Sequence, residues 1–396
     1  MLNRRHMLAA ASALFLPVPL ARAADWTATL AASKGQTVHF NAWAGSEPIN
    51  AYIQWAAEEA ERRFGFSVKH VKITDAAEVV KRVRDEVAAG KTNGSVDLIW
   101  INGENFRTMK TEKLLFGPFS ASLPNYAFVD VAGKPSTTQD FSESVDGLES
   151  PWGMAQLTFC ADGAALAKPP LNSRDLLARA QASPQRFTYP APPDFHGTTF
   201  LKQVMLEQVG DAKALYHPAG ADAGQIIGKV FTDYLDALHA VCWRGGKQFP
   251  KSQTDVTQMV ADNALDIGLT FNPNEPANLV AAGRLPASTL AWQFSTGTIG
   301  NTHFVAIPVN ATAPAAAQVF ADFLLSPEAQ ARKADIKVWG DPTVLDVAKL
   351  APAEQKLFTA AAAPGSVTLP GPTLLEPHAS WVEKIESEWL ARYGQG

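Results

Sequence analysis

The residues best suited to chemistry in this sequence are polar side chains in loops that follow predicted strands. They are amides, carboxylates, hydroxyls and one imidazole, and tryptophans nearby offer flat apolar surfaces. Apolar walls with a few placed polar groups are typical of sites that bind small molecules. The predicted ligand-binding residues are Asn41, Trp43, Gly45, Ser46, Asn102, Glu104, Asn105, Trp152, Asp194, His196, Thr198, Asn272, Glu275 and Thr296.

Each of these residues also has a purely structural interpretation. Packing in a core explains any single tryptophan as well as ligand contact does, and a role in a turn explains any single loop asparagine. His196 is better explained as a hydrogen-bonded turn residue, and Ser46 as the cap of a following helix. The sequence leaves these alternatives open.

Motifs of enzymes and metal sites are missing from the sequence. Residues 89–92 look like the end of a phosphate-binding loop, but position 85 is Asp instead of the required Gly, and the segment follows a predicted helix. The eight histidines lack metal-ligand spacing. No activated nucleophile or acid–base pair is recognisable. We therefore predict a binding protein without enzyme activity, metal or cofactor. The alternatives are an exported enzyme and an interaction protein that needs no small ligand.

Alternating strands and helices position the polar loops. Residues 37–42, 67–73 and 96–101 have the composition of strands, and amphipathic patterns between them predict helices from Ser46 to Gly65 and from Asp75 to Gly90. This order implies a parallel sheet. In such sheets ligands bind at the carboxyl ends of the strands, near helix N-termini with free N–H groups.

The same alternation returns later in the chain. We predict further strands at 186–189, 266–271 and 304–308, and helices from Thr198 onward and at 230–241, 314–325 and 380–393, with a loop at 360–372. The 396 residues exceed the ~250–300 at which a single core stops growing, so two α/β lobes are expected.

The N-terminus has the order of a secretory signal. Arg4 and Arg5 precede an apolar run, and residues 21–23 form a small-residue cleavage site. The adjacent arginines resemble a twin-arginine signal, although general secretion tolerates them too. Cleavage after Ala23 would remove three arginines and no acid, taking the net charge from -5 to -8. An acidic surface argues against nucleic-acid binding.

Cys160 and Cys242 can form a disulfide in an oxidising compartment, but their spacing does not establish one.

Two groups of segments resemble the extracellular solute-binding proteins of ABC importers. Residues 151–153, 157–162 and 169–177 are similar to the segment that crosses the hinge in that family. Here Phe-Cys-Ala-Asp at 159–162 replaces the usual tyrosine and asparagine, which argues against direct ligand contact from this segment. Residues 305–308, 316–320 and 323–330 are similar to the family's returning strand and its "FLLSPEAQ" helix pair. Residues 97–106 resemble the YnjB-type subgroup, and polyamine-binding proteins are more distantly similar.

The resemblance implies a periplasmic-binding-protein-like fold of type II, with two α/β lobes joined by a hinge. Expected parts are a signal peptide at 1–23, lobe 1 at 24–154 plus 302–345, lobe 2 at 155–301, and C-terminal helices at 346–396. The protein would be a periplasmic monomer that delivers a small polar solute to ABC permease subunits in the inner membrane.

The resemblance does not fix the solute. The sequence lacks the adjacent tyrosines of ferric-ion binders. Carboxylates at Glu104, Asp194 and Glu275 would suit an amine, whereas helix starts at Ser46 and Thr198 would suit an anion. We expect a small polar solute with at least one donor group. We also expect Trp43 and Trp152 to face the cleft, and the segments near 151–160 and 299–307 to cross between the lobes.

Overall fold

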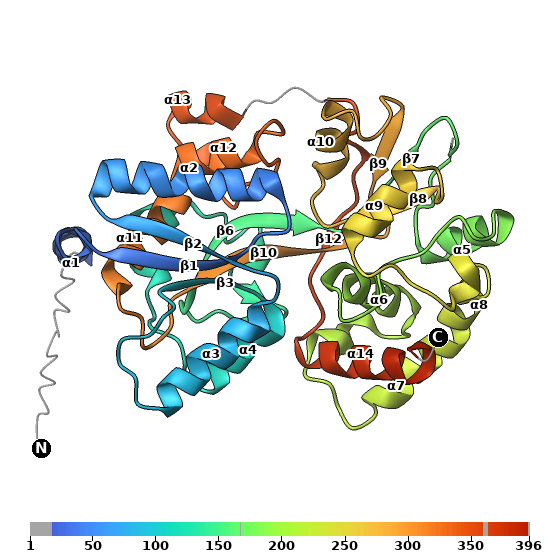
Figure 1. The fold of residues 1–396 in the computed structure, drawn as a ribbon, viewed down its shortest axis with the longest axis horizontal. Helices are drawn as coiled ribbons and strands as arrows, with labels where there is room; N and C mark the ends of the chain where they lie inside the picture. The colour runs from blue at the N-terminus through green and yellow to red at the C-terminus, as the bar shows by residue number, and fades with distance from the viewer. Residues whose placement is uncertain (1–17, 167, 359–362, 395–396) are drawn as a thin grey trace, which may run out of the picture.

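The computed structural model describes residues 18–166, 168–358 and 363–394. Most of the predicted signal sequence, residues 1–17, lies outside these ranges. The remaining signal residues belong to helix α1, Val18–Ser33. Two α/β lobes stand side by side, with β6, β10 and β12 passing between them (Figure 1).

Lobe 1 is built on a sheet with the strand order β12-β10-β3-β1-β2, in which β6 also pairs with β10. The strands β1, β2 and β3 are parallel, as the sequence predicted, whereas β10 runs antiparallel to β3 and β6. The strands are β1 Thr37–Trp43, β2 Ser67–Ile73, β3 Leu98–Ile101, β6 Glu149–Gln156, β10 Thr298–Ala306 and β12 Thr373–Leu374. The helices are α2 Glu47–Phe64, α3 Ala76–Ala88, α4 Gly103–Thr111, α11 Pro314–Leu324, α12 Pro327–Ala334 and the short α13 Pro352–Gln355.

Helix α2 shows how local sequence produces an element of lobe 1. Pro48 stands in its first turn, and Gly65 ends it with a φ of 75°, a left-handed conformation that favours glycine. The buried residues Ile49, Tyr52 and Ile53 recur at helical spacing. They pack in a core with alternate residues of β1.

Lobe 2 has a separate sheet with the strand order β11-β9-β7-β8. Its strands are β7 Thr158–Asp162, β8 Ile267–Thr270, β9 Thr289–Trp292 and β11 Val367–Leu369. Its helices are α5 Ser173–Ala182, α6 Phe195–Gln208, α7 Ala223–Val230, α8 Asp236–His239, α9 Gln253–Ala261, α10 Glu275–Ala281 and α14 Ser380–Tyr393. The C-terminal helix α14 contributes Trp381, Ile385 and Trp389 to the core of this lobe.

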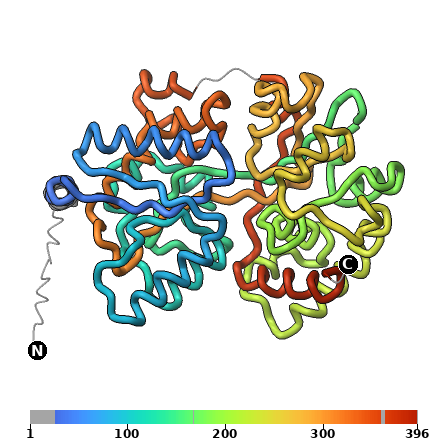
Figure 2. The backbone as a smooth tube through the Cα atoms, in the orientation of Figure 1, coloured from blue at the N-terminus to red at the C-terminus, as the bar shows by residue number. Residues whose placement is uncertain are grey.

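The chain passes between the lobes at several places (Figure 2). Strand β6 ends in the first sheet at Gln156, and β7 begins in the second sheet at Thr158. Strand β10 returns the chain to lobe 1. After a bridge between Val129 and Leu345 in lobe 1, the chain joins lobe 2 again at β11. The segments expected to cross, near 151–160 and 299–307, contain most of β6, the start of β7 and most of β10.

Several predicted elements differ from the structure. Residues 186–189 form no strand, and the carbonyls of Arg186 and Phe187 accept single bonds from the N–H groups of Asp266 and Trp243 instead of a ladder. The predicted loop at 360–372 contains β11. The predicted helix at 230–241 is interrupted by a π-helical turn, Phe231–Leu235. Helix α6 begins at Phe195, earlier than predicted. Cys160 and Cys242 are free, buried thiols.

Candidate functional site

Trp43 ends β1, and Ser46 lies in the short loop that follows it. Trp43 is 39% exposed, and its ring lies so close to Gly45 that a Cβ there would be 2.2 Å from a ring carbon. Ser46 precedes α2, but its hydroxyl makes no capping bond, contrary to the expected role. Asn41 is buried within β1, where its amide donates to the carbonyl of His39. Of the side chains of Asn41, Trp43 and Ser46, that of Trp43 is the most exposed.

The start of α4 holds two more predicted residues. Asn102 donates through Nδ2 to the carbonyl of Thr302 at 2.5 Å, and Gly103 donates its N–H to Asp140 Oδ2 at 2.6 Å. The Glu104 side chain is partly open to solvent. The protein around it nevertheless weakens the hydration of its carboxylate, and this raises its pKa. Lys202 lowers that pKa, whereas Glu386 and Glu376 raise it. Asn105 makes a long contact of 3.5 Å with the Glu104 carboxylate.

The charges near Glu104 come from lobe 2. Lys202 on α6 is buried, and its Nζ lies 2.6 Å from Glu376 Oε2. Glu376 also accepts a bond of 3.1 Å from the Asn301 amide, and its burial raises its pKa despite the lysine. The ammonium of Lys202 lies 4.1 Å from the centre of the Phe141 ring and 5.7 Å from that of Phe195. This lysine is thus already neutralised within the protein.

A third carboxylate, Glu386 on α14, completes the group. It accepts a bond of 2.6 Å from Thr198 Oγ1, and loss of solvation raises its pKa. Glu104, Lys202, Glu376 and Glu386 form what we call the interlobe acidic cluster, with three carboxylates and one ammonium. Of these, Glu104 alone was predicted from the sequence, together with Thr198, the partner of Glu386. Lys202 had one signal, a charge within the apolar run of α6, whereas Glu376 and Glu386 had none.

Other predicted residues join the lobes directly. Asn272 and Asn278 donate to the carbonyl of Trp339 at 3.2 and 2.7 Å, and Asn274 donates to that of Gly340 at 2.5 Å. Trp339 belongs to the core of lobe 1. Glu275 accepts bonds from Thr270 and Gln253 within lobe 2. Asn272 and Glu275 thus already have partners within the protein, and their contact with a solute stays a prediction.

Three predicted residues of lobe 2 also have structural partners. Asp194 caps α6 by accepting bonds from the N–H groups of His196 and Gly197. The ring of His196 lies 3.6 Å from the same carboxylate. Thr296 donates to Glu207 at 2.9 Å. These contacts match the turn interpretation of His196.

Trp152 lies in the core of lobe 1 and not at its surface. It is fully buried, in edge-on contact with Phe40, Trp100 and Trp339. The buried ammonium of Lys333 lies 4.0 Å from its ring centre. Trp152 was expected to face the cleft, but the structure places its ring in this aromatic cluster, inside the core of lobe 1.

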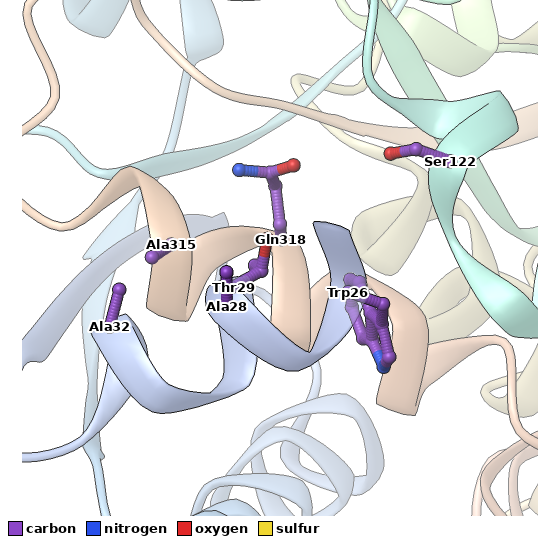
Figure 3. Close-up of a pocket in the computed structure, with 7 residues that line it drawn as sticks. All are labelled: Trp26, Ala28, Thr29, Ala32, Ser122, Ala315 and Gln318. Atoms are coloured by element: carbon purple, nitrogen blue, oxygen red, sulfur yellow. The ribbon is translucent and has the colours of Figure 1, made fainter. Parts of the chain in front are cut away.

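A hollow of about 380 Å³ lies elsewhere, between α1 and α11 (Figure 3). Its walls are Trp26, Ala28, Thr29, Ala32, Ser122, Ala315 and Gln318. It contains no charged side chain and none of the predicted residues, so we do not place the site there. Among the residues that the structure describes, no group of three or more His, Cys, Asp or Glu side chains is placed to hold a metal ion.

Comparisons with known proteins agree with this architecture. The sequence model of the bacterial extracellular solute-binding proteins matches residues 54–363. Protein YnjB of Escherichia coli K12 is 47% identical over 374 residues, which are 94% of this chain and 95% of YnjB.

Solved structures support the same fold. The periplasmic binding protein AfuA of Actinobacillus pleuropneumoniae has a TM-score of 0.61 at 16% identity, covering 91% of this chain and 99% of AfuA. The substrate-binding protein PotD of Streptococcus pneumoniae has a TM-score of 0.62 at 13% identity, covering 90% and 98%. At these identities the likeness shows the type II periplasmic-binding-protein fold.

Proposed function

This chain belongs to the family of bacterial extracellular solute-binding proteins, the substrate-binding components of ABC importers, and we propose that it captures its solute between the two lobes. The proposed lobes are residues 24–154 with 302–345, and residues 155–301, with residues 346–396 packing on both. The two separate sheets and the chain crossings between them support this division. Closure would occur by hinge motion.

The proposed binding region is the interlobe acidic cluster. Glu104 lies on α4 of lobe 1 and Glu386 on α14, which packs in lobe 2, and the Glu386 carboxylate raises the pKa of Glu104. Lys202, the lysine of this cluster, is already paired with Glu376. Bringing further carboxylates together between closing lobes costs free energy unless a cation or hydrogen-bond donors accompany them.

The cluster has more carboxylates than ammonium groups, and this supports the proposal that the solute has an amine-like or other donor group. The fold alone does not choose a solute, since PotD belongs to a spermidine/putrescine transporter and the AfuA structure holds fructose-6-phosphate. Trp43 and Phe195, 39% and 40% exposed, offer aromatic surfaces for such a group. Glu104 and Glu386 therefore take the place of the earlier candidates Asp194 and Glu275.

We further propose that the protein is exported by its N-terminal signal, by the twin-arginine route or general secretion, and acts in the periplasm as a monomer. It would pass its solute to permease subunits in the inner membrane without altering it. The lack of nucleophile and acid–base motifs supports a binding role. None of the helices in the described part of the chain is long and apolar enough to cross a membrane.

Native mass spectrometry of protein purified from its own periplasm should reveal a co-purified solute. Calorimetry with that compound then tests the site: Glu104→Gln and Glu386→Gln should each weaken binding at least about tenfold. Glu388→Gln, on the same helix as Glu386, should not. Unchanged or tighter binding by both cluster variants would favour an anionic solute and overturn this assignment.

A further inference from the structure

The turn between β4 and β5 has an unusual backbone. These short strands, Gln139–Asp140 and Glu143–Ser144, form a hairpin on lobe 1. Its two turn residues, Phe141 and Ser142, have φ values of 44° and 60°. A bulky residue such as phenylalanine adopts this left-handed conformation only where its surroundings hold it there.

Most of the contacts that hold this turn come from the C-terminal segment. The N–H of Ala379 donates to the carbonyl of Phe141 at 3.0 Å, and Ser142 Oγ donates to the carbonyl of Glu376 at 2.7 Å. His378 Nε2 lies 3.1 Å from Glu143 Oε1. The Phe141 ring packs in a small buried cluster with Ala379 and Val382, and the Lys202 ammonium lies 4.1 Å from its centre.

The C-terminal segment that contacts the turn is itself fixed to lobe 2. The N–H of His378 donates to the carbonyl of Leu215 at 2.8 Å, and Trp381 Nε1 donates to that of His217 at 3.0 Å. The helix that follows, α14, packs in the lobe 2 core. The contacts of the turn therefore join one lobe to the other.

The base of the hairpin is fixed to lobe 1 at the start of α4. Asp140 accepts the N–H of Gly103 at 2.6 Å. The Phe141 ring covers Gly103 so closely that a Cβ there would lie 2.7 Å from it. Glu104, a proposed solute ligand, is the next residue. The turn thus touches both the opposite lobe and the backbone that presents Glu104.

We infer that the Phe141–Ser142 turn is a latch that fastens lobe 1 to lobe 2 beside the solute site. The two hydrogen bonds to the carbonyls of Phe141 and Glu376, the contact between His378 and Glu143, and the ring contacts are made together when the lobes meet and are lost together when they part. Separation of the lobes also frees the turn to leave its left-handed conformation. The inference rests on the proposed hinge closure, and it adds that this turn sets the balance between closed and open forms.

The test measures the distance between the lobes without any solute. Spin labels at Lys81→Cys on α3 and Lys229→Cys on α7 report on exposed positions of opposite lobes, and the native thiols are buried. Phe141→Asn removes the ring but keeps a residue that tolerates the left-handed conformation. We expect the distance distribution to broaden and move to longer values.

Phe195→Asn is the matched control, because Phe195 contacts the same lysine but lies in the same lobe as it. We expect it to leave the distances unchanged. If Phe141→Asn does not fold, as judged by circular dichroism, Ser142→Ala provides the same measurement with a smaller expected shift. Unchanged distances in the folded latch variant, or equal shifts in the control, would overturn the latch. Absence of a bound solute would count against the proposed function and not against the latch, since no solute enters this test.

Discussion

The Lys202 ammonium and the Glu376 carboxylate lie 2.6 Å apart, and both side chains are almost completely buried. Lys202 comes from α6, and Glu376 from the segment between β12 and α14. The pair therefore ties the C-terminal segment to the body of lobe 2, next to both the proposed solute site and the latch.

Removing one charge of this pair should destabilise the fold strongly. Lys202→Met or Glu376→Gln leaves a buried charge without its partner, and each should lower the free energy of unfolding by about 3–5 kcal/mol. The double variant should lose much less than the sum of the two. Urea denaturation of the four proteins measures the coupling; additive losses would show that the pair does not act as a unit.

Trp43 and Trp152 should respond to truncation in opposite ways. Trp152→Ala removes a fully buried ring and should cost about 3–5 kcal/mol of stability. Trp43→Ala removes a partly exposed ring, so stability should change by about 0.5 kcal/mol or less while solute affinity falls. Thermal melts and calorimetry separate the two effects. A large loss of stability in Trp43→Ala with full affinity would place Trp43 outside the site.

Glu149 should make the protein less stable as the pH rises. It is fully buried, and neither of its carboxylate oxygens has a hydrogen-bond partner among the residues that the structure describes. Burial raises its pKa well above 4.5. The unfolded chain releases this proton near pH 4.5 and the folded chain releases it only at higher pH, so the contribution to stability declines above pH 4.5.

Glu149→Gln removes that titration while keeping the shape of the side chain. We expect the variant to be more stable than the wild type at pH 8, with the difference shrinking toward pH 4.5. Chemical denaturation at several pH values measures it, and Glu47→Gln, at an exposed position, serves as the control. A variant that is less stable at pH 8 would mean that the carboxylate has a favourable partner.

His239 should make the protein less stable as the pH falls, the opposite of the effect of Glu149. Its ring accepts or donates a bond of 2.7 Å with the Tyr189 hydroxyl, and burial lowers its pKa to about 4. The unfolded chain takes up the proton near pH 6.5, so stability is complete above that value and is lost as the pH falls toward 4. The loss from this residue should reach about 3 kcal/mol at pH 4. In His239→Gln this part of the pH dependence should vanish; an unchanged slope between pH 6.5 and 4 would assign it to other groups.

Local sequence determined the elements of this protein. The spacing of apolar residues between Ser46 and Gly65 predicted a helix that the structure contains, because helix periodicity and termini depend on neighbouring residues. In the same way Ser326 caps α12 by accepting the N–H of Ala329, three residues on. The family and its two-lobed fold also followed from motifs within continuous segments.

The tertiary structure alone decided which polar groups meet. Asn272 and Asn274 follow a strand, as ligand residues do, but their amides are taken up by carbonyls of the other lobe. Lys202, Glu376 and Glu386 lie on separate segments, and only the docking of α14 on lobe 2 brings them near Glu104. A residue's type fixes what it can donate or accept, whereas its partner depends on long-range packing. Most elements could therefore be predicted from the sequence, whereas Lys202, Glu376 and Glu386 of the acidic cluster could not.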